Sequence, residues 1–246
     1  MIIQRSKLPC FDICALRSEK NGDTVFIVGG GGGMKSGVTN AVEVARGTSK
    51  GLKFDMNHTT GSKLGNCITA VASNGREYVA VGISGQCRLY EVVRDKEGAV
   101  VMQEVFEFQV DFSDGQDGPD VKCITFLQRV GGVLGGSGLE LVTGGADGVC
   151  RLWSVDQQAG TWGGKKWKAK QTSVLMEHDG PINSISTCDD YVFTAGKDGW
   201  LKSVSVAKED GHSQSTGLSK ECLKRTGNQK LECRSVACVR NGSLVH

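Results

Sequence analysis

The glycine-rich segment between Gly29 and Asn40 is the part of this chain whose residue types are best suited to hold an ion or contact a partner. It reads Gly-Gly-Gly-Gly-Gly-Met-Lys-Ser-Gly and is followed by Val-Thr-Asn40. Apolar runs at 25–28 and 41–44 flank it and are typical of two strands. A hairpin turns in two to five residues, whereas this connection uses about a dozen. Because each glycine costs roughly 0.5–1 kcal/mol relative to alanine, the segment predicts a function beyond turning.

Three interpretations of this segment compete. A phosphate loop of the GxxxxGK[ST] type would need a glycine where Met34 stands before Lys35-Ser36, and a helix after it, yet a second strand follows. A floppy hairpin tip is the plainest alternative. An ordered functional loop, in which backbone carbonyls or amides converge on an ion or press against a partner, is the interpretation we favour.

Composition limits the possible functions without naming one. The 246 residues suit one large β domain, and a net charge of +2 indicates neither a nucleic-acid nor a membrane partner. The ten cysteines include no CxxC pair, and Cys10 and Cys14 fall on one face of an expected strand. They therefore predict buried free thiols rather than disulfides or zinc ligands. No signal-peptide core or membrane-spanning run is present, so the chain as written is expected to be soluble.

Internal repetition predicts the fold class. One pattern occurs at 81–90, 144–153 and 195–204, and each copy is a tight turn between two strands with a further strand before it. Four short strands per unit are typical of a propeller blade. The sequence therefore predicts an all-β, WD-type β-propeller that is incomplete. The expected blades span 8–47, 64–110, 119–170 and 172–210, with the start of a fifth at 220–246.

The stretch from Gly145 to Trp153 resembles a WD repeat. Trp153 closes the third strand, and Asp147 lies in the tight turn. His178, in Glu-His-Asp-Gly, resembles the histidine that precedes such a repeat and is expected to reach the turn around Asp198. We interpret these four residues as structural, through hydrogen bonds and packing within a blade. The Trp- and Lys-rich stretch 162–170 is typical of nucleic-acid contact, but a solvated loop is favoured.

The glycine run, the Lys35-Ser36-Gly37 segment with Asn40, and the degenerate WD repeats together resemble the prolactin regulatory element-binding protein family and its yeast-type relatives. The resemblance implies a guanine-nucleotide exchange factor for the small GTPase that initiates the COPII coat, on the cytoplasmic face of the endoplasmic reticulum. It implies a potassium ion held by the carbonyls of Gly31, Gly32 and Gly33. It also implies a membrane anchor, which we expect to lie outside this chain. The implied GTPase-contacting loop comprises Gly30, Gly31, Gly32, Gly33, Lys35, Ser36, Gly37 and Asn40.

Exchange needs no covalent catalyst, and the sequence offers no paired carboxylates, activated nucleophile or metal-ligand cluster. We therefore expect no enzyme chemistry beyond exchange. The chain stops soon after an Arg240-Asn-Gly-Ser243 turn, so a fragment lacking the closing blades, with an unpaired and aggregation-prone edge, is expected. The alternative is a WD-repeat scaffold without exchange activity, and a nucleotide-binding enzyme is a third candidate.

Overall fold

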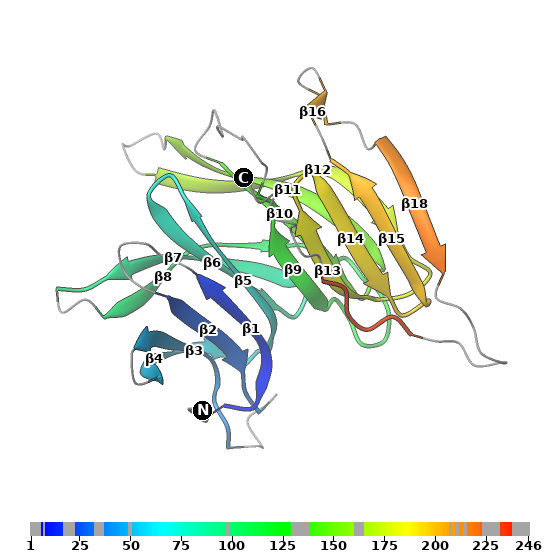
Figure 1. The fold of residues 1–246 in the computed structure, drawn as a ribbon. Coiled ribbons are helices and arrows are strands. Elements are labelled where there is room, and N and C mark those ends of the chain that lie inside the picture. The colour runs from blue at the N-terminus through cyan, green and yellow to red at the C-terminus, as the bar shows by residue number, and fades with distance from the viewer. Residues whose placement is uncertain are drawn as a thin grey trace, which may run out of the picture.

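The described residues form four antiparallel four-stranded sheets arranged around a common centre (Figure 1), and a separate two-stranded hairpin. A computed structural model describes residues 6, 8–16, 23–31, 37–48, 51–96, 99–128, 138–159, 165–206, 208–209, 212–213, 216–222 and 232–237. All regular structure in these ranges is β-strand. The predicted all-β WD propeller with four blades is thus confirmed.

Each blade is a four-stranded sheet whose first strand lies toward the centre. Blade 1 contains β1 (Cys10–Leu16), β2 (Thr24–Gly29), β3 (Asn40–Thr48) and β4 (Gly51–Gly61). Blade 2 contains β5 (Gly65–Ser73), β6 (Arg76–Ile83), β7 (Gln86–Arg94) and β8 (Val100–Gln109). Blade 3 contains β9 (Val121–Phe126), β10 (Leu139–Gly145), β11 (Val149–Ala159) and β12 (Lys165–Glu177). Blade 4 contains β13 (Ile182–Cys188), β14 (Tyr191–Gly196), β15 (Trp200–Ser205) and β18 (Thr216–Cys222), with a small hairpin of β16 (Lys208–Glu209) and β17 (His212–Ser213) inserted before β18.

The observed boundaries of blades 1, 3 and 4 differ from the expected ones, because their fourth strands lie further along the chain than the sequence predicted. The fourth strand of blade 1 runs to Gly61, beyond the expected end at 47, and that of blade 3 runs to Glu177. Blade 4 takes its fourth strand from 216–222, so a fifth blade does not begin at 220. Residues 232–237 instead lie beside β13, where Asn183 Nδ2 donates to the Cys233 carbonyl at 2.9 Å. Residues 238–246 lie outside the described part of the chain.

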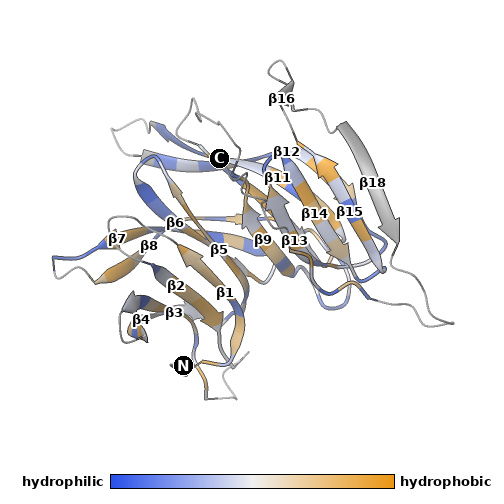
Figure 2. Cartoon of the chain, in the orientation of Figure 1, coloured by the Kyte–Doolittle hydropathy of each residue, from blue (hydrophilic) through white to orange (hydrophobic). Residues whose placement is uncertain are grey.

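Apolar side chains pack mainly between neighbouring blades. Blades 1 and 2 share a buried cluster that includes Phe26, Val44, Val81 and Tyr90. Two further clusters join blade 2 to blade 3 and blade 3 to blade 4. Strands β2, β5 and β9 are accordingly largely apolar (Figure 2). Burial between sheets is therefore the main source of stability.

Three paired residues, one from each of the first three strands, form a row across the sheet at the same register in all four blades. Comparing these rows shows how the blades differ. The rows are Ile13-Ile27-Glu43, Ile68-Val81-Arg88, Ile124-Thr143-Arg151 and Ile185-Thr194-Lys202. They lie on the rear face of each blade, meaning the face turned toward the preceding blade. Ile68 and Ile124 are only 4% and 7% exposed there. Ile13 is 56% exposed, since none of the described sheets precedes blade 1.

The third-strand residue of this row is basic in blades 2 to 4 and acidic in blade 1. Arg151 Nη1 donates to the carbonyl of Val110, which follows the last strand of blade 2, at 3.3 Å. Lys202 Nζ likewise donates to the carbonyl of Glu177 at the end of blade 3. Glu43 occupies the equivalent position in blade 1 and accepts a hydrogen bond from Ser6 Oγ at 2.5 Å. Ser6, which precedes β1, therefore provides a hydrogen-bond donor for this buried carboxylate.

The cysteines largely follow the sequence prediction. All those described are free, and five are buried: Cys67, Cys87, Cys123, Cys150 and Cys233. Burial raises the pKa of the Cys67 and Cys123 thiols well above its ordinary value. The expectation that Cys10 is a core residue is wrong, because it is exposed at the start of β1.

Candidate functional site

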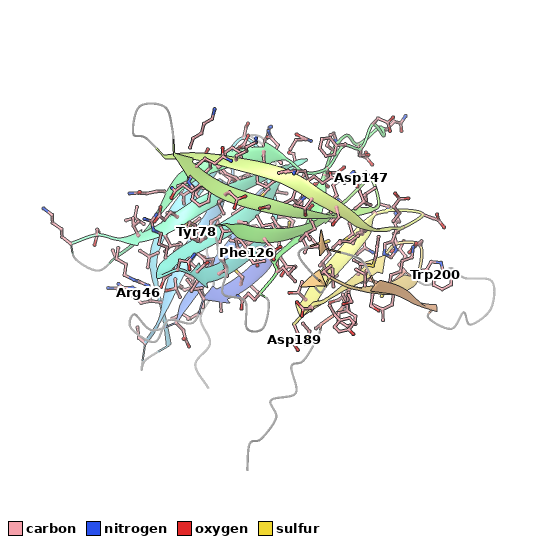
Figure 3. All side chains as sticks on the ribbon, turned by 90° about the horizontal axis from the view of Figure 1, so that it is seen from above. Arg46, Tyr78, Phe126, Asp147, Asp189 and Trp200 are labelled. Atoms are coloured by element: carbon pink, nitrogen blue, oxygen red, sulfur yellow. The ribbon has the colours of Figure 1, made fainter. Side chains whose placement is uncertain are left out.

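One end of the propeller gathers the connections that carry the predicted site residues. In antiparallel four-stranded blades, the link from second to third strand and the link to the next blade leave the sheet at the same end. We call this end the loop face. Figure 3 labels Asp147 and Trp200 on this side of the molecule and Arg46 and Tyr78 on the other. The described residues of the connections on the loop face are 30–31 and 37–39, 62–64, 84–85, 110–120, 146–148, 178–181 and 197–199.

The base of the glycine segment is a close-packed junction. Gly30 donates its N–H to the Pro9 carbonyl at 3.2 Å and has φ +152°. A Cβ on Gly30 would lie 2.3 Å from Asn40 Oδ1, so only glycine fits beside this amide. Asn40 Nδ2 in turn donates to the Gly61 carbonyl at 3.4 Å. The strand before the segment, the strand after it and the end of β4 thus meet at Asn40.

A second set of contacts ties this junction to blade 2. Thr60 Oγ1 donates to the Lys63 carbonyl at 3.1 Å, and Lys63 Nζ donates to Gln86 Oε1 at 3.2 Å. Gln86 begins β7, directly after the tight turn at 84–85. The glycine segment is therefore anchored on a support that spans two blades.

The structure places some of the predicted loop residues and not others. Gly30, Gly31, Gly37 and Asn40 are described, whereas Gly32, Gly33, Lys35 and Ser36 lie outside the described residues. Asn40 is only 4% exposed, so it braces the base of the segment instead of presenting its amide to a partner. Strand β3 begins at Asn40. The phosphate-loop interpretation, which needs a helix there, is therefore wrong.

The described part of the chain shows neither a cluster of metal-ligating side chains nor a membrane-spanning helix. No group of three or more His, Cys, Asp or Glu side chains there is arranged to hold a metal ion. Of the three carbonyls expected to bind potassium, only that of Gly31 belongs to the described residues. The same residues form no helix long and apolar enough to cross a membrane.

His178 and Asp198 lie together at the loop face of blade 4. His178 Nδ1 is 2.9 Å from Asp198 Oδ1, and Nε2 is 2.8 Å from Thr194 Oγ1. Burial lowers the pKa of His178 although Asp198 opposes the shift. The neutral imidazole therefore donates from Nδ1 to the carboxylate and accepts from Thr194 at Nε2. Asp198 also accepts from the N–H of Trp200 and fixes the turn.

Blade 3 has a tryptophan–threonine hydrogen bond that blade 4 lacks, and an aspartate where blade 4 has its histidine. Trp153 Nε1 donates to Thr143 Oγ1 at 2.9 Å, whereas blade 4 has Val204 at the register position of Trp153. Asp111 takes the place that His178 has in blade 4. Its Oδ2 accepts from the N–H of Ala146 at 2.6 Å, next to the turn that contains Asp147. Blade 3 thus has the Trp–Thr hydrogen bond and blade 4 the His–Asp hydrogen bond, and neither blade has both.

Residues that sequence reasoning missed surround Asp147. Arg151 Nη1 lies 2.6 Å from Asp147 Oδ2, and the Arg151 guanidinium lies 5.0 Å from the ring centre of Phe112. The N–H of Phe112 donates to Asp147 Oδ2 at 3.2 Å. A single aromatic residue within the aspartate-rich connection 110–120 was the available signal.

The His178–Asp198 pair predicts that stability falls in mild acid. Because the pKa of His178 is lower in the folded protein, protons bind preferentially to the unfolded chain below about pH 6.5. Burial alone would raise the pKa of Asp198, but hydrogen bonds from His178 and the chain lower it, which extends the loss below about pH 4. Urea unfolding of the wild type should show a lower midpoint at pH 5.5 than at pH 7.5. A His178→Asn variant should lose a clear part of that difference, and an unchanged difference would contradict the assignment.

Comparisons with known proteins agree with this geometry. The WD domain, G-beta repeat, family matches residues 169–203, which include His178 and Asp198. Sqt1 from Chaetomium thermophilum superposes with a TM-score of 0.54 at 16% identity, over 81% of this chain and 44% of that one. The same protein bound to the N-terminus of the ribosomal protein L10 superposes with a TM-score of 0.56 at 15% identity, over 84% and 50% of the two chains. No curated protein matches the chain by sequence.

These findings define the protein as a β-propeller that contains a WD repeat. At such low identity the likeness to Sqt1 shows the fold alone. The chain spans about half the length of these solved propellers, at 44% and 50%.

Proposed function

We propose that this chain is a protein-interaction module that engages its partner through the loop face. The observation that supports this most is the junction of Gly30, Asn40 and Gly61, where a glycine without room for a Cβ and a buried amide anchor a long connection. Fixing the ends of the connection in this way costs conformational entropy, and a solvated hairpin tip has no need of such fixed ends. A rigid base is what a projecting contact element requires.

The partner we propose is the small GTPase that initiates the COPII coat, with the chain acting as its exchange factor. An exchange factor binds the nucleotide-free GTPase more tightly than the loaded form, so by linkage it weakens nucleotide affinity by the same factor. The glycine segment, with Lys35 and Ser36, would project toward the GTPase. A potassium ion on the carbonyls of Gly31, Gly32 and Gly33 would stiffen it. This function places the protein at the cytoplasmic face of the endoplasmic reticulum.

The alternative is a scaffold that binds a protein without accelerating exchange. A propeller of the same fold, Sqt1, is bound to the N-terminus of the ribosomal protein L10. That complex supports the general use of this fold for protein binding. It favours no particular partner for this chain.

Exchange kinetics separate the two candidates. The GTPase is loaded with a fluorescent GDP analogue, and its release is followed with wild-type chain and with Gly31→Val. We expect Gly31→Val to slow release at least about tenfold, because a branched side chain would spread the carbonyls and block close approach. Replacing potassium by lithium should slow wild-type exchange as well.

The matched control is Gly115→Val, in another connection of the loop face. A Cβ on Gly115 would make only an ordinary contact of 3.5 Å with Ser113 Oγ, and its φ is not in the left-handed region, so this substitution tests valine without touching the glycine segment. It should leave exchange unchanged. Equal rates for wild type, Gly31→Val and the lithium sample would reject the exchange function and leave the scaffold.

A further inference from the structure

Phe112 is an exposed aromatic ring that the loop face holds in one position. It is 55% exposed, yet its N–H is bonded to Asp147 and its ring lies over the Arg151 guanidinium. Arg151 is itself nearly buried and fixed by Asp147 and the Val110 carbonyl. The ring therefore rests on a charged group that has no freedom to move away.

The connection that carries Phe112 is equally fixed. Asp111 is buried and accepts hydrogen bonds from Ser113 N–H at 2.8 Å, Asp120 N–H at 3.1 Å and Ala146 N–H. A large apolar side chain exposed on a rigid support costs little entropy when a partner covers it. Aromatic residues of this kind dominate binding energy at protein interfaces.

Charge around the ring indicates which partner fits. The connection 110–120 contains four aspartates and no lysine or arginine, and Asp114 and Asp117 are exposed. Exposed Glu177 at the end of β12 and exposed Asp179 in the connection 178–181 add to this charge. That connection lies against the turn 146–148, because His178 N–H donates to the Gly148 carbonyl at 2.8 Å. The exposed cations lie at the margin of this site: Lys197 beside Pro181, Lys122, which pairs with Asp120, and Arg234, in the segment bonded to Gly196.

We propose that Phe112 is the anchor of a second docking site, which takes a basic peptide segment of a partner protein with an apolar side chain. The apolar side chain packs on the Phe112 ring, and lysine or arginine residues on either side lie near the carboxylates of Asp114, Asp117 and Asp179. The site spans blades 2 to 4. It shares the loop face with the proposed function but does not depend on the glycine segment.

Fluorescence anisotropy tests this with the full chain and three labelled 12-residue peptides of alternating Lys/Leu, Glu/Leu and Lys/Ser. We expect saturable binding of the Lys/Leu peptide only, weakening at least about fivefold between 50 and 200 mM salt. Phe112→Ala should weaken it at least about tenfold. The double variant Asp114→Asn/Asp117→Asn should reduce its salt dependence.

Tyr191→Ala is the matched control, because Tyr191 is a 52% exposed aromatic residue at the opposite end of blade 4. It should leave binding unchanged, as should Gly31→Val, which separates this site from the proposed exchange function. Absence of binding by the Lys/Leu peptide, binding of all three peptides alike, or equal losses in Phe112→Ala and Tyr191→Ala would each overturn the proposal.

Discussion

Replacing Trp153 by alanine should lower the free energy of unfolding by about 3–5 kcal/mol, the range for a large aromatic lost from a core. The indole is buried in the cluster between blades 2 and 3, where Phe108 meets it edge-on at 5.3 Å. The truncation also leaves the Thr143 hydroxyl without its indole donor. Since whole domains are stable by about 5–15 kcal/mol, this single change should remove a large share. Urea unfolding followed by circular dichroism measures it.

Two further variants apportion that loss. Trp153→Phe keeps most of the packing and deletes the bond to Thr143, so it should cost about 1–2 kcal/mol. Val174→Ala removes an exposed apolar side chain of β12 and should change stability by no more than about 0.5 kcal/mol. A loss below about 1 kcal/mol for Trp153→Ala would show that the blades 2 and 3 do not share a packed core.

His178→Ala should be the second most costly change, at about 2–3 kcal/mol. The substitution removes the hydrogen bonds to Asp198 and Thr194 and leaves a nearly buried carboxylate with only backbone donors. For a chain of this size, the loss corresponds to a fall in melting temperature of roughly 4–12 °C. Differential scanning fluorimetry at pH 7.5 detects such a shift.

A double-mutant cycle shows whether that cost belongs to the pair. If His178 and Asp198 act together, His178→Ala should cost much less in an Asp198→Asn background than in the wild type. Independent, additive losses would mean that each residue stabilises blade 4 through other contacts.

The tight turns are the part of the fold that the sequence predicts best, and the reason is local. Gly148 and Gly199 have φ values of 73° and 83°, which glycine adopts without strain, so the Asp-Gly pairs mark hairpins directly. The fourth strands lack such a mark. The first half of β12 is rich in lysine, so its composition resembled a loop, yet it pairs with β11 and buries Trp167 in the core between blades 2 and 3.

The site residues also fall into two groups, those whose contacts could be predicted from one repeat and those whose contacts could not. His178 and Asp198 lie 20 positions apart in a motif that one repeat contains, and their meeting follows from the WD pattern. Asp111 replaces that histidine in blade 3, and its contact with Ala146 spans 35 positions without any motif. Phe112 acquires its support from Arg151 and Asp147 only once blades 2 and 3 have packed.

Glu43 gives blade 1 a chemical identity that the other three described blades do not share. The four blades share one strand order and one cross-strand register, so the backbone alone does not distinguish them. Arg151 and Lys202 each close the seam with the preceding sheet by donating to a carbonyl at its edge. At that seam Glu43 would bring a carboxylate against the same carbonyl oxygen, and two acceptors without a proton between them repel. Blade 1 is therefore unsuited to the places of blades 3 and 4, and one acidic side chain distinguishes it from the sheets that close those two seams.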